Sequence, residues 1–124
     1  MPALTDLRAE VVEVLQAADI NAVANVPDRL SPPLAIVTPG VPYVGTINQF
    51  GKYQVNIQVL LVTGTGTNLA ITEALDTAIE TAVVALDEAE YDLQQVGEPT
   101  GFDINGATYL GALIAITTSV SLGG

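Results

Sequence analysis

The feature that most constrains the fold is a change of hydrophobic period in the middle of the chain. Over residues 53–63, apolar side chains alternate with amide side chains, which predicts a β-strand with one apolar face. After Leu60 both faces become apolar, so we expect this end of the strand to be covered on both sides. A Gly-Thr-Gly-Thr break follows. Residues 69–88 then place apolar side chains at three- and four-residue steps, which predicts a long helix.

The remaining segments predict one further helix and a set of strands. Residues 5–18 have the helical period. Strands are expected at residues 22–26, 34–37, 91–96 and 110–122, with the second ended by Pro39-Gly40 and a hairpin turn at Asn105-Gly106. The order α-β-β-β-α-β-β(-β) predicts an α+β fold, in which two helices pack on a mostly antiparallel sheet. A chain of 124 residues is expected to form a single domain, 1–124.

Residues 39–52 form the loosest stretch, because Pro and Gly recur through it. It nevertheless carries four large apolar residues, Tyr43, Val44, Ile47 and Phe50. A loop folded onto its own core would account for them. So would an arm that packs on a neighbouring molecule. The second interpretation predicts that residues 41–50 contact another subunit.

Composition argues against several classes of function. The chain has no His, Cys or Trp, and its three cations (Arg8, Arg29 and Lys52) stand against 14 acids, for a formal net charge of −11. Without His or Cys, nothing serves as the usual base or nucleophile, so we expect no enzymatic activity and no cofactor. Few cations argue against gripping nucleic-acid phosphates or anionic lipid. No apolar run approaches the about 20 residues of a spanning helix, and no secretory signal is visible.

Two local patterns have a chemical and a structural interpretation. The Gly-Thr-Gly-Thr segment before Asn68 lies where a phosphate loop would, but Leu69 replaces the third Gly and no Lys follows. A tight turn with a helix cap is favoured, although a nucleotide-binding enzyme remains the alternative that this segment supports. The acids Glu73, Asp76 and Glu80 share one helix face, which is typical of a solvated surface rather than a cation site.

Taken together, the segments resemble the tail terminator proteins of long-tailed bacteriophages, small subunits of the neck region. The resemblance runs over the whole chain and depends on the order and spacing of its parts. These are the Leu7-Arg8-Ala9-Glu10 helix ending near Asp19-Ile20, Arg29–Val37, Pro39–Tyr43, Tyr53–Val62, Leu75-Asp76-x-x-Ile79-Glu80 and Asn105–Ala112. None of these segments is a catalytic signature.

The resemblance implies a structural virion protein, located in the tail and neck and assembled in the host cytoplasm. Such subunits form a hexameric ring that caps the completed tail tube and joins it to the head connector or stopper protein. Genome DNA passes through the lumen without specific binding. Another neck component, such as a head-completion, stopper or head-tail joining protein, is the main alternative. A tail-tube subunit is disfavoured, because tube subunits are usually richer in strand.

Two sets of site residues follow from this interpretation. We expect the subunit interface to include the apolar residues of 39–52 and the scarce cations: Tyr43, Val44, Ile47, Phe50, Arg8, Arg29 and Lys52. We expect the lumen to be lined by acids from the set Glu73, Asp76, Glu80, Asp87, Glu88 and Glu90. An acidic wall would repel the DNA backbone and let it slide. No catalytic, cofactor-binding or metal-binding residue is predicted.

Overall fold

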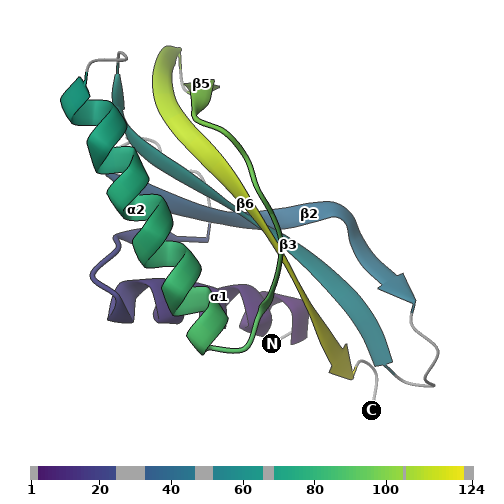
Figure 1. The fold of residues 1–124 in the computed structure, drawn as a ribbon. Helices are drawn as coiled ribbons and strands as arrows, with labels where there is room; N and C mark the ends of the chain where they lie inside the picture. Colours follow the sequence, from purple (N-terminus) through teal and green to yellow (C-terminus); the bar gives the residue numbers. More distant parts are fainter. Residues whose placement is uncertain (1–2, 25–32, 47–51, 66–68, 105, 122–124) are drawn as a thin grey trace.

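The predicted element order is confirmed in a computed structural model, which describes residues 3–24, 33–46, 52–65, 69–104 and 106–121 (Figure 1). The fold is α+β. Its elements are α1 (Ala3–Ala17), β1 (Ala22–Val23), β2 (Leu34–Thr46), β3 (Lys52–Thr65), α2 (Leu69–Glu88), β4 (Asp92–Val96), β5 (Thr100–Ile104) and β6 (Ala107–Ser121). The long helix has the predicted limits, because its apolar stripe runs unbroken between them.

The strands form one six-stranded sheet in the order β1-β2-β3-β6-β4, and β5 pairs with residues 107–111 at the start of β6. All pairings are antiparallel except that of β1 with β2. β3 and β6 pair along almost their whole length, from Lys52↔Ser121 to Thr65↔Tyr109. The predicted alternation is confirmed on β3, where Val55, Ile57 and Val59 are buried and the amides between them are half-exposed.

Both helices contribute to a single core on one face of this sheet. α1 buries Leu7, Val11 and Leu15, and α2 buries Leu75, Ala82 and Leu86. These residues recur at four- and seven-residue spacings, so each helix turns one continuous stripe toward the strands. The stripes join the inward-facing residues of β2, β3 and β6 in one cluster. At the far end of β3, Leu61 and Val62 are both 1% exposed, so cover on both faces is confirmed there.

One prediction was wrong: β2 does not end at Pro39-Gly40. The Ala35 N–H donates to Asn21 O at 2.8 Å, on the side of β2 that faces away from β3. Backbone nitrogens alternate in direction along a strand, so the nitrogen of Pro39, four residues further on, also points away from β3. The missing N–H of Pro39 therefore removes no bond to β3. At Gly40 a Cβ would lie 2.8 Å from the Asn56 backbone, so only Gly fits there. The register shifts between Pro39 and Val44, and the strand continues through this bulge to Thr46.

The expected loop at 39–52 is accordingly mostly sheet. Residues 40–46 belong to β2 and Lys52 begins β3, whereas Ile47 and Phe50 lie outside the described residues. The ends of β2, β3 and β6 pair with one another and extend past both helices (Figure 1). We call this three-stranded end, residues 44–46, 52–55 and 118–121, the arm.

Candidate subunit-contact surfaces

The arm presents apolar side chains and a cation beyond the helical layer. Val44 is 36% exposed, Lys52 is exposed, and Tyr53 and Val120 are half-buried. Thr46 pairs with Tyr53, which in turn pairs with Val120, so the aromatic ring stands at the centre of the three strands. The arm thus unites Val44 and Lys52, two residues predicted to contact another subunit.

The base of the arm is held by side-chain amides on the sheet face opposite the helices. Asn56 Nδ2 donates to Pro42 O at 2.8 Å across the bulge. Gln54, Asn56 and Gln58 line a groove of about 290 Å³ with Gln94 of β4. This face of the sheet carries uncharged amides, whereas the outer face of α2 carries acids.

Two other predicted contact residues hold buried polar atoms that are unpaired. Arg8 and Tyr43 are both half-buried. Within the described part of the chain, neither Arg8 Nε nor Tyr43 Oη has a hydrogen-bond partner. An unsatisfied buried group costs about 1–3 kcal/mol. Arg29, the remaining predicted contact residue, lies outside the described residues.

The six predicted lumen acids are all exposed. Glu73, Asp76 and Glu80 lie along the outer face of α2, and Asp87, Glu88 and Glu90 lie at its C-terminal end. The last turn of α2 holds no basic residue. Acids at the negative end of the helix macrodipole each cost about 0.3–1 kcal/mol at low salt. Among the described residues, no group of acids could hold a metal ion.

Sequence reasoning missed a contact that joins α1 to the end of α2. Tyr91, which is 5% exposed, donates its hydroxyl hydrogen to Glu10 Oε1 at 2.6 Å. Burial raises the pKa of Tyr91, and the hydrogen bond and negative charge of Glu10 raise it further. The two residues are 81 positions apart, and no local sequence pattern connects them.

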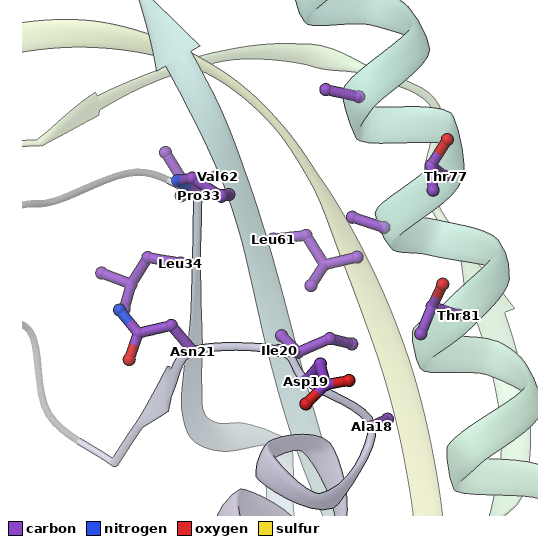
Figure 2. Close-up of a pocket in the computed structure, with 12 residues that line it drawn as sticks. Ala18, Asp19, Ile20, Asn21, Pro33, Leu34, Leu61, Val62, Thr77 and Thr81 are labelled. Atoms are coloured by element: carbon purple, nitrogen blue, oxygen red, sulfur yellow. The ribbon is translucent and has the colours of Figure 1, made fainter.

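A cavity of about 400 Å³ opens between the α1–β1 turn, the start of β2, the end of β3 and the middle of α2 (Figure 2). Its apolar lining consists of Ala18, Ile20, Pro33, Leu34, Leu61, Val62, Ala74 and Ala78, of which Leu34, Leu61 and Val62 are buried. Polar groups stand at Asp19, Asn21, Thr77 and Thr81, and Figure 2 shows Thr77 and Thr81 on the α2 side.

A shallow depression adjoins this cavity and shares Ala18, Asp19 and Thr81 with it. The rest is lined by four residues of α2: Glu80, Val84, Ala85 and Glu88. The apolar cavity is therefore bordered by three exposed carboxylates, those of Glu80 and Glu88 on α2 and of Asp19 in the α1–β1 turn. No sequence pattern pointed to this surface, because it is assembled from four separate segments.

Comparisons with protein-family profiles and with curated protein sequences give no match. Neither helix described in the structure has an apolar stretch long enough to cross a bilayer. The segment 64–68, considered above as a phosphate loop, begins inside β3, and residues 66–68 lie outside the described part.

Proposed function

We propose that the protein is a structural virion subunit, a tail terminator. It forms a hexameric ring that caps the completed tail tube and joins it to the head connector, with DNA passing through the lumen. The observation that carries the proposal is the arm. It projects past the helices and exposes Val44 and Lys52, as a surface that packs on another subunit would.

Unpaired backbone at the edges of the sheet also supports assembly. β1 pairs only with Ala35 and Ile36, so in the described residues the outer edge of β2 beyond Ile36 has no partner strand. Open edges of this kind are ready sites for contact with another chain.

The charge distribution suits a ring traversed by DNA. The outer face and C-terminal end of α2 carry six exposed acids: Glu73, Asp76, Glu80, Asp87, Glu88 and Glu90. If some of these line the lumen, the wall repels the phosphate backbone and DNA slides without being held. In the assembled virion the protein then lies in the neck, between the tail tube and the head connector.

Mass measurement with the tube present tests the proposal. The purified protein is analysed by light scattering and negative-stain imaging, alone and with isolated tail tubes. The terminator function predicts rings of about six subunits and a cap at one end of each tube. A protein that stays monomeric with tubes present refutes it. Decoration along the tube would favour a tube subunit, and binding only to the head connector would favour a stopper protein.

A further inference from the structure

We infer that the arm of one subunit docks on the next subunit at the cavity of Figure 2, with Lys52 against the carboxylates of Asp19, Glu80 and Glu88. The occupant of the cavity is thus a second copy of this chain. The inference rests on the proposed ring and names the two surfaces that meet in it.

The two surfaces cannot meet within one chain. Lys52 and Val62 lie on the same strand, with Lys52 at its first residue and Val62 at the cavity. The separation of ten residues corresponds to about 33 Å at ~3.3 Å per residue. Leu61, also in the cavity, is similarly about 20 Å along β3 from Val55, the partner of Val44. Contact between arm and cavity is therefore intermolecular.

The surfaces match in charge and in polarity. Lys52 is one of only three cations in a chain of net charge −11, and it is exposed at the end of the arm. The cavity is bordered by three carboxylates that share the shallow depression beside it. Opposite charges arranged in this way steer encounter and fix register.

Apolar contact complements the charge pairing. Val44 is 36% exposed on the arm, and Tyr53 stands beside it on the same face of the sheet. Among the residues that line the cavity, Ile20 and Ala78 are half-buried and Ala74 is exposed, so these three provide the accessible apolar surface for such side chains. A volume of about 400 Å³ is within the range of protein pockets that enclose a bound group.

A contact between two different surfaces has a geometric consequence. An arm-to-cavity contact is heterologous, so each bound subunit still offers a cavity or an arm to another. Repetition of such a contact closes into a ring when the rotation between subunits allows it. The inferred contact is therefore of the type that a hexameric ring requires.

Disulfide trapping tests the contact, because the natural chain has no Cys. The double variant V44C/T81C is oxidised under conditions in which the rings form. We expect a ladder of covalent oligomers ending near six subunits on a non-reducing gel. The matched control V44C/V96C moves the second thiol to the exposed position of Val96 on β4 and should give no ladder.

Charge exchange provides a second, independent measurement. We expect K52E and E80K each to weaken subunit association about tenfold or more, since like charges then meet at the contact. The combination K52E/E80K should restore most of the loss. The control E98K makes the same change of net charge as E80K, at a position outside both linings, and should leave association unchanged.

The outcomes separate this inference from the proposed function. Rings that form without a V44C/T81C ladder, and whose K52E/E80K double variant shows no restoration, overturn the arm-to-cavity contact and leave the terminator proposal standing. Absence of rings with tail tubes present overturns the terminator proposal itself. A ladder in a protein that never caps tubes would support the contact and refute the terminator.

Discussion

Replacing Glu90 by Gly should stabilise the protein, because Glu90 holds a backbone conformation that suits Gly. Its φ is 68°, in the left-handed region. Glu90 N–H donates to Asp87 O at 3.0 Å and Tyr91 N–H donates to Leu86 O at 3.1 Å, the two bonds of a Schellman motif. Leu86 and Tyr91, at opposite ends of that motif, are both buried, so packing holds the backbone in place.

Three terms set the size of this effect. A residue with a Cβ in the left-handed region costs about 1–2 kcal/mol relative to its usual conformation. Removing a carboxylate from the C-terminal end of α2 contributes about 0.3–1 kcal/mol at low salt. Against these, the greater freedom of Gly in the unfolded chain costs about 0.5–1 kcal/mol. The net expectation for Glu90→Gly is a stabilisation of about 1 kcal/mol.

Urea unfolding at fixed protomer concentration measures this change. Circular dichroism should show a higher midpoint with an unchanged slope, and thermal unfolding should shift upward by about 4 °C for a domain of this size. The matched variant Glu90→Ala removes the same charge and keeps the Cβ, so it separates backbone strain from the charge effect. If Glu90→Gly is no more stable than Glu90→Ala, the strain argument is wrong.

Three further predictions concern packing, titration and charge. Gly111→Ala should destabilise by about 1–3 kcal/mol in urea unfolding, since its Cβ would lie 2.5 Å from Leu61 O, whereas Gly45→Ala, with 4.0 Å of space, should change little. Because burial raises the pKa of Tyr91, the neutral hydroxyl is favoured in the folded state. Stability should therefore be intact below the unfolded pKa of about 10 and fall above it by up to about 1.4 kcal/mol per pH unit. Tyr91→Phe should show a shallower alkaline decline in urea midpoints, and an equal decline in both proteins would contradict the assignment. If the lumen is acidic, replacing Glu73 by Lys in assembled rings should increase DNA retention in gel-shift assays at low salt, and unchanged retention would argue against that position.

The elements were predictable where a single period ran without interruption. The stripe of α2 and the alternation of β3 each specify one element, because burial of one face is the only way to satisfy them. The hairpin at Asn105-Gly106 was likewise predictable. β5 and β6 do pair across it, and Gly106 has a φ of 84°.

Residues 39–46 were not predictable, because the effect of a Pro depends on which way its nitrogen points. Pro39 in a central strand would remove a ladder bond, whereas at the outward position of β2 it removes none. Pairing with β3 therefore overrides the local tendency of Pro and Gly to form a turn. The candidate contact surface was likewise predictable only in part. Val44 and Lys52 could be nominated from their residue types, but their union in a paired arm depends on the register between strands.

The sequence by itself determined the class of fold, the order of its elements and the extreme scarcity of cations, because these depend on local period and composition. Only the tertiary structure decided that residues 44–46 extend the sheet past the helices and that Tyr91 meets Glu10. It alone brought Asp19, Leu61 and Thr81 to one cavity. Such contacts join segments far apart in the chain, and their distances follow from strand register and helix packing, which no local pattern encodes.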